Sequence, residues 1–378
     1  MINKLKRNLW LNLKNLPGWR TQRKILIIES DDWGSIRMPD KVTYNKLLKS
    51  GLSVDKSPFT MFDTLASRDD LVNLMNVLCK VTDRKGNHPV FSPFANVANP
   101  DFAKILNCGY NKYYYEALPD TLASYFCDNV FEIWQKGIEN ELFVPQYHGR
   151  EHFNVPQWLR YLRQKNDKVL KGFNNNFVHV NLPNMNPPQL SGFAPAYYFD
   201  CQDDLEYLRY SIVDGVNLFE KLFGYLPSSF DPPNGIFHPS LEESLHQKNL
   251  KCIVTNRKRL EPDIKGKLHK KSFLFKFGCQ NEFNQTYYRR NCKFEPFQLS
   301  YTGIESTLKE ISAAFFWQKP AIISTHRINY VGGLNREIRD YSLIEFEKLL
   351  FSIVNKWPDV EFISSYKFGD LIANSRYN

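Results

Sequence analysis

The sequence lacks the features that mark disulfide-rich, membrane-spanning and disordered proteins. Its seven cysteines are odd in number, scattered and never in a CxxC pair, which argues against a disulfide framework and a thiolate metal site and favours a reducing compartment. Charged residues interrupt the apolar positions of the first 24 residues, so neither a signal-peptide core nor a membrane span is expected there. Hydrophobic residues make up 43% of the chain and aromatic residues 15%, with no low-complexity tract, which predicts a folded globular protein.

Several catalytic signatures are also missing. There is no Walker loop, no GxGxxG after a predicted strand, no GxSxG elbow and no cysteine with a recognisable partner histidine. The net charge of +9 allows an anionic partner such as a phospholipid surface or a phosphate-bearing glycan. The basic residues are mostly dispersed and no nucleic-acid motif accompanies them, so we expect no nucleic-acid partner.

The chain is predicted to consist of an N-terminal segment, residues 1–23, and one large domain, residues 24–378. The segment contains basic residues but no acid, and Pro17-Gly18 ends a helical pattern of leucines at positions 5, 9, 13 and 16. A basic amphipathic helix of this kind either lies on an anionic membrane surface or packs onto the domain. Peripheral membrane contact through residues 1–22 is therefore one of two hypotheses.

The domain is organised around an apolar run from Lys24 that stops at Asp31 and Asp32. A short Ile/Leu run predicts a strand buried on both faces, and ligand chemistry in α/β proteins lies at the carboxyl ends of such strands. Neighbouring residues at a strand end point to opposite sides, so one aspartate can bind a metal while the other faces a substrate or water. The alternative is that either aspartate caps a turn or a helix.

Two histidines lie at and just beyond the end of another predicted strand. The stretch from Leu142 to His148 is predicted to be a strand, and His152 lies four residues beyond His148. If a helical turn begins at His148, both imidazoles emerge on one side, with a spacing that suits one divalent ion.

The remaining pattern alternates strands with helices. Further strands are predicted at 88–94, 252–255, 320–326 and 361–365, and helices after Ser67 and at about 120–136, 158–170, 203–223, 303–317 and 343–355. His326 ends a late strand and is a third candidate for the site, whereas His88 and His179 are expected to be structural. Residues 257–299 are basic and irregular, which predicts hairpins or a loop excursion. Counting strand ends gives seven or eight, the number of an α/β barrel.

Asp32, His148 and His152 form a ligand set of two histidines and one carboxylate, found in hydrolytic zinc sites and in some mononuclear iron sites. A zinc-bound water can attack an amide or ester carbonyl. Asp31 is then placed to accept the water's proton, and His326 to protonate the leaving amine.

These motifs resemble the polysaccharide deacetylase family (NodB homology, carbohydrate esterase family four). The resemblance runs from Lys24 to Ser365 and rests on Ser30-Asp31-Asp32, the HxxxH pair, Phe230-Asp-Pro-Pro-Asn-Gly235 and Ser324-Thr-His326. It implies a distorted (β/α)7–8 barrel with insertions, a divalent metal, usually zinc, and hydrolysis of N-acetyl groups on a glycan. It also implies that Asp31 is the base, that Asp32, His148 and His152 are the ligands, and that His326 is the acid. Asp31-Asp32-Trp33-Gly34 is similar to the opening of the YdjC-like chitooligosaccharide deacetylases, which places Trp33 among the supporting residues.

The chain departs from the family pattern at three positions. Asp231 stands where the family has an arginine, and Asn234 where it has a tyrosine whose backbone N–H contacts the oxyanion. Asn256 stands in place of an Asp-and-Trp motif that orients the acid histidine. One hypothesis reconciles these changes: Asp231 orients His326, while Arg150 or Arg327 holds Asp31.

The expected function is a metal-dependent hydrolase that removes N-acetyl groups from a sugar of a cell-surface polysaccharide or its precursor. A lipid-linked or nucleotide-linked precursor fits the expected cytoplasmic location, at the inner membrane face if the first helix binds there. The alternatives are hydrolysis of another amide or ester on the same barrel, and glycan binding by a degenerate site.

Overall fold

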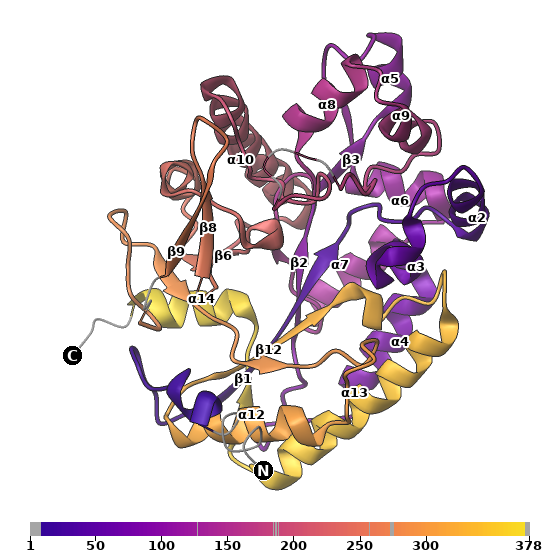
Figure 1. Cartoon of the computed structure of the whole chain (residues 1–378). Helices are drawn as coiled ribbons and strands as arrows, with labels where there is room; N and C mark the ends of the chain where they lie inside the picture. The colour runs from indigo at the N-terminus through magenta and orange to yellow at the C-terminus, as the bar shows by residue number, and fades with distance from the viewer. Residues whose placement is uncertain are drawn as a thin grey trace.

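The computed structural model describes residues 9–126, 128–183, 185, 187, 189–256, 258–272 and 276–374. Its centre is a nine-stranded sheet whose strand pairs are all parallel (Figure 1). Eight strands follow the order β10-β7-β6-β5-β2-β1-β12-β11, and β13 pairs with β1. The strands are β1 (Lys24–Trp33), β2 (Phe91–Ala95), β5 (Gln146–Tyr147), β6 (Ser229–Phe230), β7 (Cys252–Val254), β10 (Thr286–Tyr288), β11 (Cys292–Lys293), β12 (Ala321–His326) and β13 (Val360–Phe362).

The two edge strands of this sheet are consecutive in the chain. Only residues 289–291 separate β10 from β11, and this connection spans at most about 14 Å. In a flat sheet the two edges would lie roughly 34 Å apart. The sheet must therefore curl until its edges face each other, which confirms the predicted α/β fold as a distorted (β/α) barrel.

The first strand has the predicted position at the middle of the sheet. Ile25 to Ile28 are at most 1% exposed, because β1 pairs with β12 along one edge and with β13 and then β2 along the other. The register with β12 sets Asp31 opposite His326. The pairing with β2 is irregular between Ser30 and Trp33, and Asp32 there has a φ of 73°.

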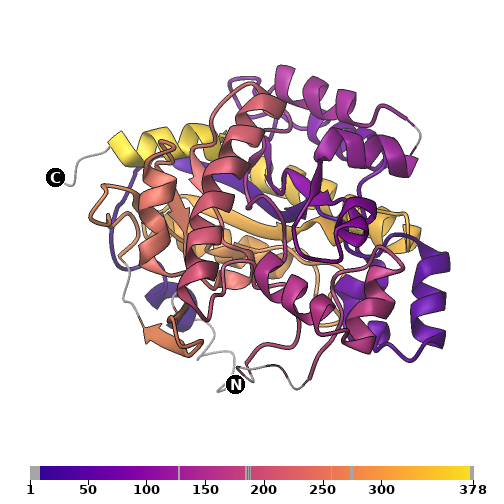
Figure 2. The ribbon, with the colours of Figure 1, turned by 90° about the horizontal axis from the view of Figure 1, so that it is seen from above.

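Helices cover the outside of the sheet (Figure 2). They are α2 (Lys41–Lys49), α3 (Pro58–Phe62), α4 (Arg68–Cys79), α5 (Phe102–Asn107), α6 (Leu118–Phe126), α7 (Phe131–Glu139), α8 (Val155–Arg163), α9 (Asp167–Phe173), α10 (Gln202–Phe223), α11 (Glu242–His246), α12 (Glu305–Phe316), α13 (Arg336–Lys356) and α14 (Ser365–Asn374). The helix predicted after Ser67 is confirmed, with Ser67 and Asp70 forming a capping box. The helix predicted at 203–223 is also confirmed and ends at Gly224, whose φ is 80°.

Two predicted helices were wrong in extent. The helix expected at 120–136 is the pair α6 and α7, and the helix expected at 158–170 is the pair α8 and α9. Asn166 causes the second break, because its side chain accepts a hydrogen bond from the Val169 N–H and caps a new helix. α5, α8 and α9 lie together at the top of Figure 1, over a hydrophobic cluster of their own that includes Trp158 and Phe173.

Smaller elements complete the description. β3 (Ala98–Pro100) pairs with β4 (Tyr115–Ala117), and β8 (Lys258–Pro262) with β9 (Leu268–Ser272), both antiparallel. The hairpin β8–β9 confirms part of the excursion predicted at 257–299. That prediction missed β10 and β11, which are edge strands of the main sheet.

The described part of the N-terminal segment packs onto the domain. Residues 9–13 are helical, Leu11 is 7% exposed, and Trp317 donates a hydrogen bond to Asn12 over 2.8 Å. Leu9, Trp10 and Leu13 are 60%, 44% and 48% exposed, so membrane contact through this segment stays a prediction. Residues 1–8 lie outside the described residues. Among the residues that the structure describes, no helix is long and apolar enough to cross a membrane.

Candidate metal and catalytic centre

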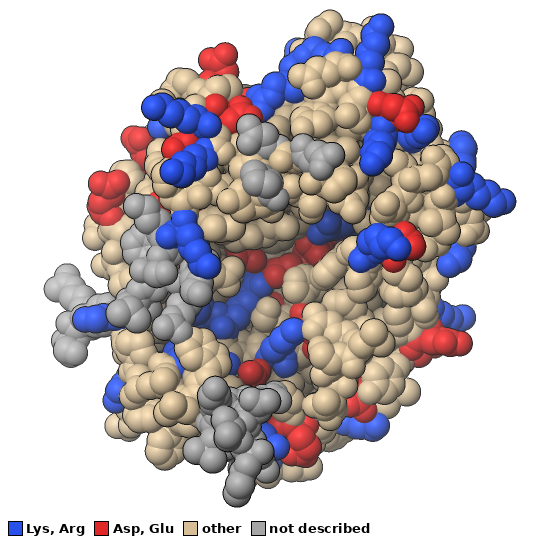
Figure 3. All heavy atoms as spheres, in the orientation of Figure 1, with Lys and Arg blue, Asp and Glu red and all other residues tan. Residues whose placement is uncertain are grey.

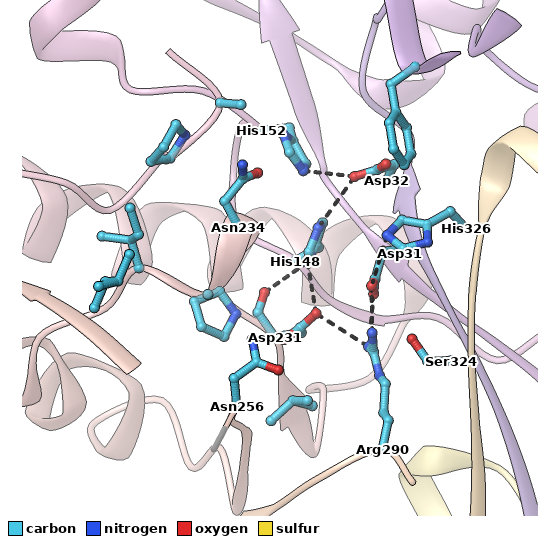
Figure 4. Close-up of a pocket in the computed structure, with 18 of the residues that line it drawn as sticks. Asp31, Asp32, His148, His152, Asp231, Asn234, Asn256, Arg290, Ser324 and His326 are labelled. Atoms are coloured by element: carbon cyan, nitrogen blue, oxygen red, sulfur yellow. Dashed lines mark hydrogen bonds and ion pairs between the residues drawn. The ribbon is translucent and has the colours of Figure 1, made fainter. Parts of the chain in front are cut away.

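A cavity of about 1100 Å³ opens at the carboxyl ends of the central strands. Figure 3 looks into this hollow, where acidic and basic side chains lie side by side on the floor. The cavity is lined by most of the predicted site residues: Asp31, Asp32, His148, His152, Asp231, Asn234 and His326. Figure 4 shows that Asp32 turns toward the two imidazoles while Asp31 turns toward Arg290. The two neighbouring aspartates therefore face different partners, as the end of a strand requires.

Asp32, His148 and His152 converge on one point. Asp32 Oδ1 lies 2.7 Å from His152 Nε2 and 3.8 Å from His148 Nε2, and one ligand atom from each residue lies within 4.8 Å of the others. All three side chains are buried. The helical turn predicted at His148 was wrong, because residues 150–153 form bends and Gly149 has a φ of 101°. The open turn still brings the imidazole rings to a centroid distance of 5.1 Å.

The protonation of these groups fits a divalent cation. His148 Nδ1 donates a hydrogen bond to the Asp231 carbonyl over 2.8 Å, which leaves the Nε2 lone pair directed at the cluster. Burial and the charge of Arg37 lower the pKa of His152 to about 4, so this imidazole is neutral at pH 7. Burial alone would raise the pKa of Asp32, but Arg37 and His152 hold it well below its ordinary value. Burial alone would lower the pKa of His148, but its hydrogen bond with Asp32 and the nearby Asp31 and Asp231 raise it. A cation that binds here would therefore displace a proton from His148.

Arg37 lies beside these ligands and would compete with a cation for Asp32 and His152. Its Nη2 atom lies 3.1 Å from Asp32 Oδ1 and 3.3 Å from His152 Nε2. Its Nε atom also lies 3.7 Å from Asp63. A bound cation would repel this guanidinium, and Asp63 offers it an alternative partner.

Asp31 is held by an arginine that the sequence analysis missed. Arg290, in the connection between β10 and β11, donates from both terminal nitrogens to the two carboxylate oxygens, with an Nη2–Oδ1 distance of 2.8 Å. Its Nε donates to the buried Glu29 over 2.6 Å. Burial alone would raise the pKa of Asp31, but the charges of Arg290, His148 and His326 lower it. Asp31 is therefore a carboxylate at neutral pH.

His326 is oriented by Glu295, a second residue that the sequence analysis missed. The His326 Nδ1 donates to Glu295 Oε1, and its Nε2 lies 3.9 Å from Asp31 Oδ2. Burial alone would lower the pKa of His326, but the Glu295 carboxylate raises it to about 10. The imidazole is therefore protonated at neutral pH and faces Asp31.

The hypothesis that Asp231 orients His326 and that Arg150 or Arg327 holds Asp31 was wrong. The Asp231 carboxylate lies 3.3 Å from Arg290 and 3.9 Å from His148, and its carbonyl supports His148. Burial and the neighbouring Asp31 raise the pKa of Asp231 to about 7, against the opposing charge of Arg290. Arg327 forms a buried ion pair with Asp63 instead, over 2.9 Å.

Two other supporting residues lie away from the cavity. Arg150 is 2% exposed and donates to Asp214 over 2.8 Å and to Tyr207 over 2.7 Å, so it does not act on Asp31. Trp33 is 1% exposed, packs edge-on against Phe143 and donates to Ser30 over 2.8 Å. Its side chain therefore lies in the core, and its supporting role stays a prediction. Asn234 does line the cavity, with a φ of 58°.

The residues that the sequence analysis missed share a cause. Arg290 and Glu295 lie beside strands of only two or three residues, in a stretch predicted to be irregular. No motif marks Arg37, whose partners are brought to it by the fold. His179 was expected to be structural, but it lines the cavity 3.3 Å from Arg37. The strand pattern around it gave no signal of this position.

No protein-family model and no curated protein matches the sequence. A solved structure described as a polysaccharide deacetylase from Mycobacterium smegmatis is 10% identical, with a TM-score of 0.42 over 94% of this chain and 93% of its own. PuuE allantoinase is 10% identical, with a TM-score of 0.44 over 95% and 94%. A CE4 family pseudoenzyme from Bacillus anthracis is 6% identical, with a TM-score of 0.35 over 91% and 65%. Polysaccharide deacetylases are thus among the structures that this chain is similar to, and its reaction has to be argued from its own residues.

Proposed function

We propose that the chain is a metal-dependent hydrolase that removes N-acetyl groups from a sugar of a cell-surface polysaccharide or its precursor, with zinc as the expected metal. The observation that carries the proposal is that the two neighbouring aspartates at the end of β1 have different partners. Asp32 faces His148 and His152, while Asp31 is kept ionised by Arg290 and lies 3.9 Å from the protonated His326. A ligand set, a base and an acid therefore share one cavity.

Each residue has a defined part in the proposed reaction. Asp32, His148 and His152 would hold the ion, which supplies a Lewis acid and lowers the pKa of a coordinated water. Asp31 accepts the proton of the attacking water, because Arg290 keeps its carboxylate ionised and oriented. His326 donates a proton to the leaving amine, because Glu295 keeps the imidazole charged. The backbone N–H of Asn234 is the proposed contact for the developing oxyanion.

The setting supports an intracellular substrate. All six cysteines that the structure describes are free, which fits a reducing compartment. A cytoplasmic location with peripheral contact at the inner membrane face remains our proposal, together with an acetylated glycan precursor as the substrate.

Two other functions remain as alternatives. A different amide or ester would use the same ligand set, acid and base. A glycan-binding protein is favoured by one observation: the Arg37 guanidinium forms an ion pair with Asp32 over 3.1 Å and neutralises its charge. Metal uptake separates this alternative from both enzyme functions.

The decisive experiment measures zinc content and acetate release on the same samples. The full chain is compared with Asp32→Ala and His148→Ala, and with His246→Ala as a control at an exposed histidine outside the cavity. We expect about one zinc per chain, lost in the first two variants and kept in the control, with acetate released from N-acetylated chitooligosaccharides. Hydrolysis of acetyl esters alone would favour the other hydrolase. No zinc uptake on titration would overturn the metal-dependent mechanism and favour the binding protein.

A further inference from the structure

One end of the cavity carries more positive charge than the proposed reaction uses. Four basic residues line it: Lys14, Arg289, Lys293 and Lys319. They come from the N-terminal segment, the β10–β11 connection, β11 and the residue two positions before β12. Arg289 Nη2 donates to the Lys14 carbonyl over 3.3 Å, and Lys14 contacts the Asn291 carbonyl. The β10–β11 connection, which contains Arg290, therefore also supplies Arg289 to this basic end.

The partners of two of these cations are neutral. Lys319 is 1% exposed and donates to the carbonyls of Gly18, over 2.6 Å, and Trp19. Lys293 donates to the Gln298 side chain over 2.7 Å. In the part of the chain that the structure describes, no carboxylate forms a salt bridge with either ammonium group, whereas Lys14 reaches Glu310 at 3.3 Å. The positive charges of Lys293 and Lys319 are therefore not balanced by a carboxylate in an ion pair among the described residues.

Lys319 is also repelled by its neighbours. Burial, together with the charges of Arg20 and Arg289, lowers the pKa of Lys319 to about 7. A buried cation that is repelled by its neighbours is stabilised by any anion that enters the cavity.

We propose that this basic end binds an anionic group of the substrate, namely the phosphate or diphosphate of a phosphate-linked N-acetyl sugar. The inference rests on the proposed function and narrows its substrate class. Arg289 and Arg290 are consecutive, and Arg290 holds the proposed base. A sugar bound at Asp31 would thus have its phosphate linkage within reach of the basic end. A nucleotide-linked and a lipid-linked sugar carry the same diphosphate chemistry.

Binding of inorganic pyrophosphate to the full chain tests the site without any turnover. We compare the parent protein with Lys293→Gln and Arg289→Gln, and with Lys348→Gln as a control at a lysine on α13 that is 60% exposed. We expect pyrophosphate to bind the parent and the control equally and each cavity variant about tenfold more weakly, with affinity falling as salt rises. Absence of binding, or equal binding by all four proteins, would overturn the proposal.

Two further measurements separate this proposal from the proposed function. Acetate release is measured from a nucleoside-diphosphate-linked N-acetylhexosamine, from vesicles that contain a polyprenyl-diphosphate-linked one, and from a neutral N-acetylated oligosaccharide. A higher kcat/KM for either diphosphate substrate, reduced in Lys293→Gln, supports the proposal and identifies the carrier. Equal kcat/KM for the neutral sugar overturns it but keeps the deacetylase. Pyrophosphate binding without acetate release from any substrate keeps the anion site and rejects the deacetylase.

Discussion

Arg290 and Asp31, which are 259 positions apart in the chain, form a bidentate ion pair. The third guanidinium nitrogen donates to Glu29, which lies two residues before Asp31 on the same strand. One arginine is thus fixed by two carboxylates of β1. The planar fork of the guanidinium permits this arrangement, which an ammonium group cannot reproduce.

Arg290→Lys is expected to reduce kcat by about a hundredfold, because one point charge cannot orient Asp31 and neutralise Glu29 together. The pKa of Asp31 is lower in the folded protein than in the unfolded chain. Ionised Asp31 therefore stabilises the fold at pH values above its unfolded-state pKa, and this stabilisation is lost as the pH falls. Weakening the ion pair should therefore move the acidic limb of the pH–rate profile to higher pH. Zinc content, which we expect to stay at the parent level, controls for folding. An unchanged acidic limb would exclude Asp31 as the base.

Glu295→Gln is expected to move the basic limb of the pH–rate profile down by more than about one unit. His326 has a raised pKa, so its protonated form persists until pH passes about 10. Without the Glu295 carboxylate, burial lowers that pKa and the imidazole loses its proton near neutral pH. Glu347→Gln on α13, a pair with Lys80 at the surface, is the matched control. A basic limb that does not move would assign Glu295 a purely structural role.

Arg37→Met is expected to increase zinc affinity by about tenfold, because the guanidinium lies 3.1 Å from Asp32 Oδ1 and repels a cation there. Competition with a chromogenic chelator measures the affinity without reference to turnover. Lys56→Met, at an exposed cation on the cavity wall, provides the control. Weaker zinc binding by Arg37→Met would instead mean that Arg37 orients the ligands.

Asp231→Asn is expected to keep its zinc, because the backbone carbonyl of residue 231 supports His148. The pKa of Asp231 is raised to about 7 in the fold. Its contribution to stability is therefore full below about pH 4 and is lost as pH rises through 7. Relative to the parent, the variant should melt at a higher temperature at pH 8, with the difference shrinking toward pH 4. Melting curves at both pH values measure this, and a lower melting temperature at pH 8 would contradict it.

Replacing Leu9, Trp10 and Leu13 by serine is expected to weaken cosedimentation with anionic vesicles. These side chains are exposed beside the packed face of the segment, so the change spares the contacts that Leu11 and Asn12 make. Leu299→Ser, at a fully exposed leucine elsewhere on the surface, is the control. Equal sedimentation of all three proteins would remove membrane contact from the proposal.

The central strands were predictable because their signal is local. Long apolar runs such as Lys24–Ser30 and Pro320–Thr325 identify buried strands, and the polar residues that end them identify the edge where the site lies. Asp31, Asp32 and His326 followed from this rule. His148 and His152 also come together, although the turn that joins them is not the predicted one.

The supporting residues could not be predicted, because their partners are distant in the chain. Arg290 and Glu295 lie near strands too short to produce a periodic pattern. Glu295 meets His326 through the pairing of β11 with β12, and Arg290 meets Asp31 only in the folded sheet. Family motifs misled the analysis here. They placed the supporting arginine and acid after β6 and β7, whereas this chain supplies both charges from the β10–β12 region.

The position of β1 has a consequence for synthesis on the ribosome. One edge of this strand pairs with β2 and β13, but the other pairs with β12, roughly 300 residues later. At typical translation rates that interval lasts roughly 15 to 60 seconds. A nascent chain therefore exposes both aspartates and an unpaired apolar edge throughout this time. The candidate site is therefore complete only when translation has passed β12 and His326.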